Sequence, residues 1–157
     1  MSKTLLDVAD LTTVFENSNQ KVTAVNHVSI SVGRGRTLGI VGESGSGKSV
    51  TAMSILRLVS GSGKIESGSI MLSIDDTSMD LLKMSEPKLR KIRGGRIAMI
   101  FQEPMTSLNP VYTAGYQVME AILLHQKIGK EEARRKTIEL FHDCLLYTSP
   151  SPRDRVQ

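Results

Sequence analysis

The feature that most constrains this chain is the octapeptide GESGSGKS at residues 42–49, which fits the pattern G-x-x-x-x-G-K-S. Its glycines, Gly42, Gly45 and Gly47, carry no Cβ, so the backbone can adopt positive φ and approach a ligand closely. Successive N–H groups then form an anion-binding concavity at the start of a helix. In this pattern Lys48 is placed to reach the β- and γ-phosphates of a nucleotide, and Ser49 offers its hydroxyl to Mg²⁺.

The segments on either side of the octapeptide support a phosphate-binding loop. Residues 37–41 form a short apolar run, which predicts a buried parallel strand. Residues 50–59 place Met53, Leu56 and Val59 at helical spacing and predict a helix. The alternative is a flexible glycine-serine turn, which accounts for neither flank. Strand, glycine loop and helix together indicate an α/β fold with a phosphate-loop core.

Composition sets limits on location and on structural type. The 157 residues suit one domain, and no apolar run approaches the roughly 20 residues that span a bilayer. The N-terminus lacks the apolar core of a signal peptide. Cys144 is the only cysteine, which excludes an intramolecular disulfide and a cysteine-based metal cluster. We therefore expect a cytoplasmic protein.

The net charge of +4 is local rather than general. Residues 83–96 hold six lysines and arginines against one glutamate, a pattern typical of a solvated basic face. Aromatic content is only 4%, and no aromatic side chain alternates with these cations. The pattern argues against a base-stacking nucleic-acid platform, so no nucleic-acid partner is expected.

The rest of the chain alternates between strand and helix patterns. We expect further strands at residues 5–15, 25–32, 67–74 and 95–101, and helices at 86–92, 114–125 and 130–141. Asp75 and Asp76 follow one of these strands, where a carboxylate can hold Mg²⁺. Because Ser73 interrupts the apolar run, a turn capped by the two aspartates is the preferred interpretation.

Residues 96–111, RIAMIFQEPMTSLNPV, resemble the Q-loop region of ABC transporter ATPases. More narrowly, they are similar to the ATP-binding subunits of bacterial dipeptide, oligopeptide and nickel importers. The resemblance covers about residues 4–143. It implies the N-terminal part of an ABC-type nucleotide-binding domain, made of the phosphate-loop core, an antiparallel β subdomain and the start of a helical subdomain.

The resemblance also implies ligands and site residues. The cofactors would be ATP and Mg²⁺, with Lys48 and Gln102 as catalytic groups, and Ser49 and Gln102 as metal contacts. Phe15 would stack on adenine, although a core position in its strand is an open alternative. Nucleotide contacts would come from the whole loop and the first residues of its helix: Gly42, Glu43, Ser44, Gly45, Ser46, Gly47, Lys48, Ser49 and Val50.

Partners follow from the same resemblance. Two ATP-binding subunits, identical or different, would dimerise around two nucleotides. The segment after Gln102, residues 104–111, would face transmembrane permease subunits. The protein would then lie at the cytoplasmic face of the plasma membrane and energise import of peptides, nickel or related solutes.

Three motifs of the family are absent from the 157 residues: a Leu-Ser-Gly-Gly-Gln-type signature, a second strand ending in Asp-Glu, and a switch histidine. His27, His125 and His142 stand in other contexts.

Residues 144–154 resemble the translation of a transposon-end adapter used in sequencing, so residues 144–157 are expected to be non-native and 1–143 the domain portion. The chain alone is expected to lack turnover, and residues 37–41 to be exposed. Two alternatives stay open: a nucleotide-binding fragment without turnover, and another phosphate-loop NTPase or kinase.

Overall fold

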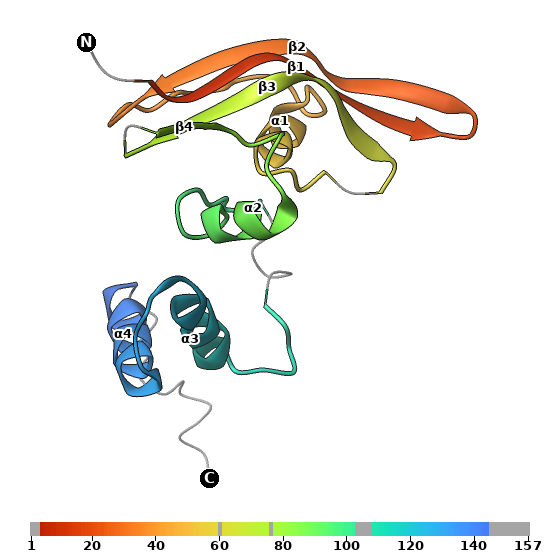
Figure 1. The fold of residues 1–157 in the computed structure, drawn as a ribbon. Helices are drawn as coiled ribbons and strands as arrows, with labels where there is room; N and C mark the ends of the chain where they lie inside the picture. Colours follow the sequence, from red (N-terminus) through yellow and green to blue (C-terminus); the bar gives the residue numbers. More distant parts are fainter. Residues whose placement is uncertain (1–3, 60, 76, 103–107, 145–157) are drawn as a thin grey trace. The chain divides into compact units, whose positions relative to one another are not determined.

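The computed structural model describes residues 4–59, 61–75, 77–102 and 108–144, which divide into two compact units between Ala98 and Met99 (Figure 1). The first unit holds four strands and two helices: β1 (Thr4–Asn17), β2 (Gln20–Gly33), α1 (Lys48–Ile55), β3 (Gly63–Ile74), β4 (Thr77–Asp80) and α2 (Glu86–Ile92). The second unit holds two helices, α3 (Ala114–His125) and α4 (Lys130–Asp143).

The four strands form one antiparallel sheet in the order β2-β1-β3-β4. Both β1 and β2 run for 14 residues and are joined at a tight hairpin, where Asn17 pairs with Gln20. Alternating apolar and polar residues along β2 suit a sheet with one face packed and one face in water. This sheet is the antiparallel β subdomain that the sequence predicts.

The long strands bend at one level of the sheet. The registers of β1 with β2 and of β1 with β3 both shift between Val8 and Thr13. Asp10 and His27 take positive φ values of 53° and 49° there, and Gly68 on β3 takes 107°. The Asp10 carboxylate and His27 Nδ1 lie 2.6 Å apart on the exposed surface. Bulges of this kind increase local twist, so the two halves of each strand run in different directions.

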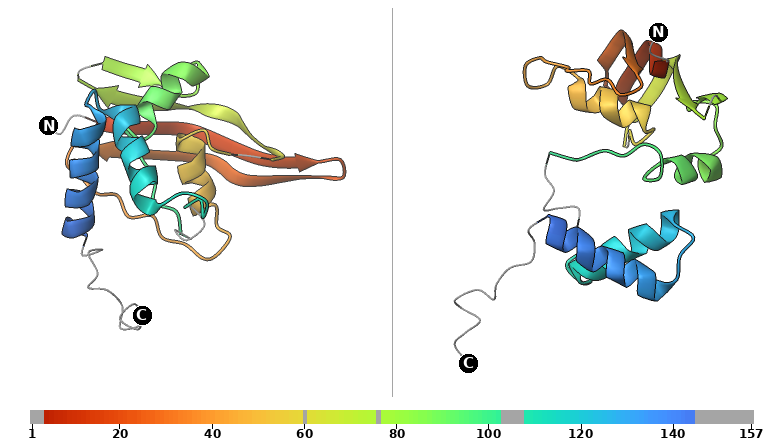
Figure 2. Two further views of the ribbon diagram at one scale, coloured as in Figure 1. Left: turned by 90° about the horizontal axis from the view of Figure 1, so that it is seen from below. Right: turned by 90° about the vertical axis from the view of Figure 1, so that its left-hand side faces the viewer.

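The core of the first unit lies between the sheet and its two helices. Val50 and Ile55 of α1 and Leu89 and Ile92 of α2 pack against one cluster of buried side chains. Both helices therefore cover the same face of the sheet (Figures 1 and 2). The buried members of the cluster are Val8, Leu11, Val25, Ile70, Leu72, Leu81, Leu89 and Ile92.

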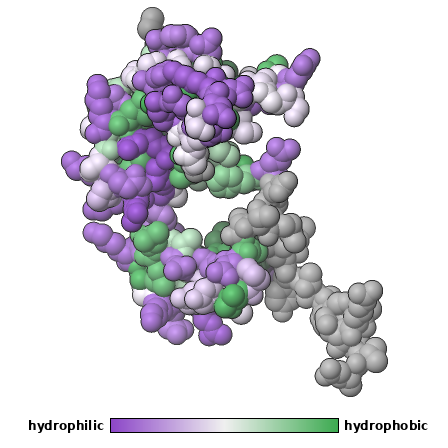
Figure 3. Space-filling model, turned by 90° about the vertical axis from the view of Figure 1, so that its right-hand side faces the viewer, coloured by the Kyte–Doolittle hydropathy of each residue, from purple (hydrophilic) through white to green (hydrophobic). Residues whose placement is uncertain are grey.

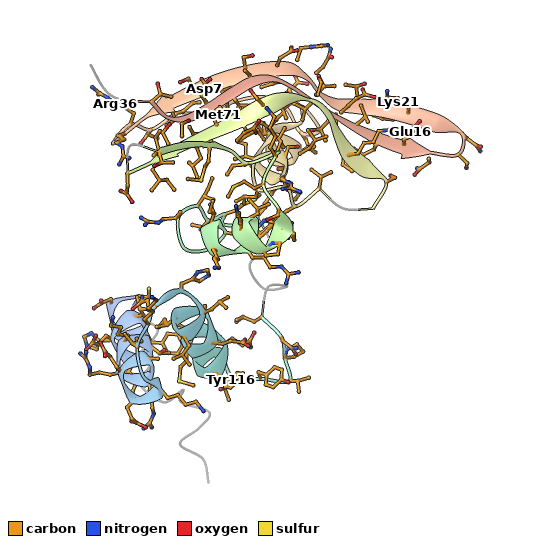
Figure 4. All side chains as sticks on the ribbon, in the orientation of Figure 1. Asp7, Glu16, Lys21, Arg36, Met71 and Tyr116 are labelled. Carbon is orange, nitrogen blue, oxygen red and sulfur yellow. The ribbon has the colours of Figure 1, made fainter. Side chains whose placement is uncertain are left out.

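Charged side chains link β1, β2 and β3 near the hairpin that joins β1 to β2, where Figure 4 labels Glu16 and Lys21. Lys21 Nζ lies 2.7 Å from a Glu66 carboxylate oxygen, and Lys64 Nζ lies 3.0 Å from Glu16. The hydrogen bond from Lys21 lowers the pKa of Glu66, and that same bond raises the pKa of Lys21. These pairs are exposed, so they help to fix the register more than they add to stability.

The second unit is a pair of packed helices. Thr113 caps α3, because its side chain accepts a hydrogen bond from the Tyr116 N–H at 3.3 Å. Residues 126–129 connect α3 to α4, which starts with Glu131 and Glu132 in its first turn. Acidic side chains at the N-terminal end stabilise the helix, because they interact favourably with the positive pole of the helix dipole. Both helices were expected from the sequence, and both are confirmed.

Two expected strands are wrong for this chain. Residues 37–41 pair with no strand among the described residues, and Leu38, Ile40 and Val41 are exposed. Residues 95–101 form no strand either, apart from a single bridge between Arg93 and Ile97. Buried parallel strands need neighbours on both sides, and the described residues supply none to either segment. The expected exposure of residues 37–41 is confirmed.

Candidate phosphate-binding site

The glycine loop closes around the Lys48 side chain. Lys48 Nζ donates to the Gly42 carbonyl at 2.7 Å, to the Glu43 carbonyl at 2.7 Å and to Ser46 Oγ at 3.2 Å. The Ser46 N–H donates to the Glu43 carbonyl at 3.2 Å and tightens the turn. The ammonium group is therefore directed into the loop, as the motif predicts.

Glycine is required at two positions of the loop. Gly45 and Gly47 have φ values of 81° and 87°, in the region that L side chains rarely adopt. A Cβ on Gly47 would also collide with the Ala24 carbonyl oxygen of β2. The loop therefore turns sharply and packs its last glycine directly on the sheet.

The start of α1 leaves backbone donors for a ligand. Gly47 is the N-cap, and the first hydrogen bond of the helix runs from the Thr51 N–H to the Gly47 carbonyl at 2.8 Å. The N–H groups of Lys48, Ser49 and Val50 precede that bond and have no intrahelical acceptor. The Ser49 side chain beside them is exposed. Backbone donors and the helix dipole together favour an anion at this point.

Buried hydroxyl groups hold α1 on the sheet. Ser54 Oγ and Thr13 Oγ1 lie 2.8 Å apart, and both residues are fully buried. Ser54 Oγ also lies 2.7 Å from the Val50 carbonyl, and Thr51 Oγ1 donates to the Gly47 carbonyl. These contacts set the position of α1 against β1, and with it the position of Lys48.

Phe15 lies on β1, opposite Val22 on one side and Gly63 on the other. Its ring is half-buried, and a Cβ on Gly63 would come within 2.7 Å of the ring. The same Cβ would also collide with Val59, so Phe15 and Val59 both flank Gly63. This position beside Gly63 fits the alternative in which Phe15 packs within its strand. Adenine stacking by Phe15 stays a prediction.

Gln102 belongs to the second unit, where its side chain is exposed. Its approach to the loop stays a prediction. Residues 103–107, which include Glu103 and Pro104, lie outside the described residues. The site residues that lie together in the described structure are those of the loop and the first turn of α1, from Gly42 to Val50.

Gln117 orders residues 109–112, a role that the sequence pattern does not predict. The Gln117 side chain accepts from the Asn109 N–H at 2.9 Å and donates to the Asn109 and Tyr112 carbonyls at 2.9 and 3.1 Å. Tyr112 and Tyr116 stack with ring centroids 5.3 Å apart. The loop is thereby pinned to α3, which leaves Leu108, Val111 and Tyr112 exposed. A glutamine one turn inside a helix gives no sequence signal for this role.

Among the residues that the structure describes, no three His, Cys, Asp or Glu side chains gather in a metal-binding cluster. No helix in this part of the chain has the length and apolar character that a membrane span requires. Asp75 lies in a turn with a φ of 47°, as preferred from the sequence, while Asp76 falls outside the described residues.

The site is a phosphate-binding loop of the kind found in nucleotide-binding proteins, and it lies between the antiparallel sheet and α1. The ABC transporter family profile matches residues 25–146, and this chain belongs to that family.

Its relatives include importer subunits. The chain is 48% identical over 134 residues to the glutathione import ATP-binding protein GsiA of Salmonella choleraesuis, covering 84% of this chain and 22% of the relative. It is 47% identical over 147 residues to the probable D,D-dipeptide transport ATP-binding protein DdpD of Escherichia coli, covering 93% and 44%. It is also 47% identical over 138 residues to the oligopeptide transport ATP-binding protein AppD of Bacillus subtilis, covering 87% and 41%. The chain thus spans less than half the length of each of these relatives.

Solved structures confirm the fold class. The dimeric post-hydrolysis structure of the ATP-binding cassette MJ0796, bound to ADP and Pi, has a TM-score of 0.73 at 24% identity. That match covers 88% of this chain and 56% of the cassette. The expected α/β architecture, with a phosphate-loop core and an antiparallel β subdomain, is that of an ABC cassette.

Proposed function

We propose that this chain is the N-terminal part of an ATP-binding and ATP-hydrolysing subunit that drives an ABC importer of peptides or related small solutes. The observation that carries the proposal is the folded phosphate loop, with Lys48 directed into it and free N–H groups at the start of α1. The identity of 47–48% to glutathione, dipeptide and oligopeptide import proteins supports the solute class.

The residues of the loop fit a nucleotide phosphate. Gly42 lines a tight cradle, because a Cβ there would lie 2.6 Å from Ser46 Oγ. Lys48 and the N–H groups from Gly45 to Val50 would bind the phosphate oxygens. Ser49 and Gln102 would hold Mg²⁺, which neutralises charge on the β- and γ-phosphates when it is bound. Phe15 is proposed to stack on adenine.

The partners are a second ATP-binding subunit and transmembrane permease subunits. The exposed apolar side chains of Leu108, Val111 and Tyr112 support a docking role for the segment after Gln102. The Gln117 hydrogen bonds give residues 109–112 a defined shape before a partner arrives. This assembly would place the protein at the cytoplasmic face of the membrane.

Residues 144–157 are proposed to be non-native, and the rest of the domain to follow residue 143 in the intact subunit. Each nucleotide would then need the signature segment of the opposite subunit. A second candidate function, nucleotide binding without turnover, applies to this chain by itself. Residues 37–41 pair with no strand among the described residues, which favours this function, because a complete catalytic core would need that segment as a paired strand.

In the intact subunit, Gln102→Ala should slow ATP hydrolysis by about 100-fold, the scale of losing one preorganised polar contact in a site. Mg-ATP affinity should change little, because Lys48 and the loop carry most of the phosphate binding. Equilibrium nucleotide binding and phosphate release at saturating ATP measure the two effects. Gln126→Ala is the matched control, since Gln126 is exposed at the end of α3. A Gln102 variant with lost affinity and normal hydrolysis would contradict the proposal.

A further inference from the structure

The far end of α1 is closed by an unusual cap. The Leu58 N–H donates to the Met53 carbonyl at 2.8 Å, and the Arg57 N–H donates to the Ser54 carbonyl at 2.9 Å. This pair of bonds is the Schellman motif, in which glycine normally takes the left-handed position. Here Arg57 occupies that position with a φ of 51°. A side chain with a disfavoured backbone conformation needs a contact that holds it there.

The Arg57 side chain provides that contact. One guanidinium nitrogen, Nη1, donates to the Leu81 carbonyl at 3.1 Å and to the Met84 carbonyl at 2.6 Å. Both acceptors lie in the connection between β4 and α2. The end of α1 is therefore tied to the segment that leads into α2.

A second arginine completes the link from the other side. Arg93 Nε donates to the Leu56 carbonyl at 2.7 Å, and its Nη2 donates to the Arg57 carbonyl at 2.8 Å. Its Nη1 lies 2.6 Å from the Glu86 carboxylate at the start of α2. Lysine cannot replace Arg93 without losing hydrogen bonds, because it does not offer the fixed fork of donors of a planar guanidinium group.

Arg93 differs from the other cations of residues 83–96. Its side chain, at the residue that follows α2, is 20% exposed, whereas that of Arg90 in the last turn of α2 is 78% exposed. The basic segment is therefore a solvated face at Arg90 but a partly buried contact at Arg93. The acceptors of Arg93 lie one short helix away from Lys48, about 12 Å along α1.

We propose that Arg93 is a positioning residue for the phosphate loop. It fixes the C-terminal end of α1 against α2, while the Thr13–Ser54 contact fixes the middle of α1 against β1. Together they hold the first turn of α1, and so Lys48, where the phosphates bind. The inference rests on the proposed function, because it needs a nucleotide in the loop.

The test uses the intact subunit and equilibrium binding of a fluorescent ADP analogue. Arg93→Ala should weaken binding about tenfold, and Arg93→Lys should stay clearly weaker than the wild type. Arg90→Ala, which removes the same charge three residues earlier, in the last turn of α2, should bind within about twofold of the wild type. Far-ultraviolet circular dichroism shows which variants keep the fold, and Arg93→Lys preserves the test if Arg93→Ala does not fold.

A double-mutant cycle separates positioning from general damage. If Arg93 acts through Lys48, the loss caused by Arg93→Ala should nearly vanish when Lys48 is already alanine. Equal losses in both backgrounds, or wild-type affinity in Arg93→Lys, would overturn the inference. If Lys48→Ala itself binds like the wild type, the proposed function fails. If binding depends on Lys48 but not on Arg93, only this inference fails.

Discussion

Replacing Lys48 with alanine in the intact subunit is expected to abolish ATP hydrolysis, a loss of about 100-fold or more. Lys48 is the cation that the loop directs inward, through bonds to the Gly42 and Glu43 carbonyls and to Ser46 Oγ. Phosphoryl transfer depends on positioning and on neutralising negative charge, so losing this ammonium removes both. Phosphate release at saturating Mg-ATP measures the effect.

Lys64→Ala is the matched control. Lys64 also follows a Gly-Ser-Gly sequence, at residues 61–63, but it lies on β3 and pairs with Glu16 on the surface. Its removal should leave hydrolysis unchanged. Full activity in the Lys48 variant, with a preserved fold, would refute the assignment of the loop.

The second large effect concerns the 157 residues expressed by themselves. They are expected to show no phosphate release above background and low solubility. Leu38, Ile40 and Val41 are 44%, 49% and 94% exposed, and Ile100 is 96% exposed. The side of the molecule drawn in Figure 3 shows patches of hydrophobic residues between hydrophilic ones. Unpaired apolar segments of this kind promote association between chains.

Expression with and without residues 144–157, compared with the intact subunit, tests this expectation. Solubility, thermal unfolding and phosphate release are the three measurements. Removing residues 144–157 should rescue none of them, because the apolar segments stay unpaired. A soluble chain that melts cooperatively and hydrolyses ATP would show that these residues suffice and that the account of a larger domain is wrong.

Elements with local signals could be predicted from the sequence. Ser85 and Pro87 mark the start of α2, Thr113 caps α3, and the alternation along residues 25–32 identifies much of β2. Each of these signals acts within a few residues, so one segment carries enough information. The phosphate loop belongs to the same group, because its spacing alone identifies Lys48 as the cation directed into the loop.

Features that depend on distant neighbours could not be predicted in this way. The apolar runs at 37–41 and 95–101 look like buried strands, but a parallel strand forms only beside partners. The Arg57 and Arg93 contacts join segments more than 20 residues apart, and charge alone made Arg93 look like a surface residue. Strand β4 was likewise missed, since four polar-rich residues give little periodicity.

The hydrogen bonds of Lys48 also bear on the heat of nucleotide binding. Its ammonium group already donates to two carbonyls and one hydroxyl, so it is solvated by the protein before any ligand enters. A phosphate that binds there replaces those acceptors and does not meet a bare cation. The enthalpy that a calorimeter records for this contact is then the difference between two sets of hydrogen bonds. A tight complex at this loop can therefore form with a modest release of heat.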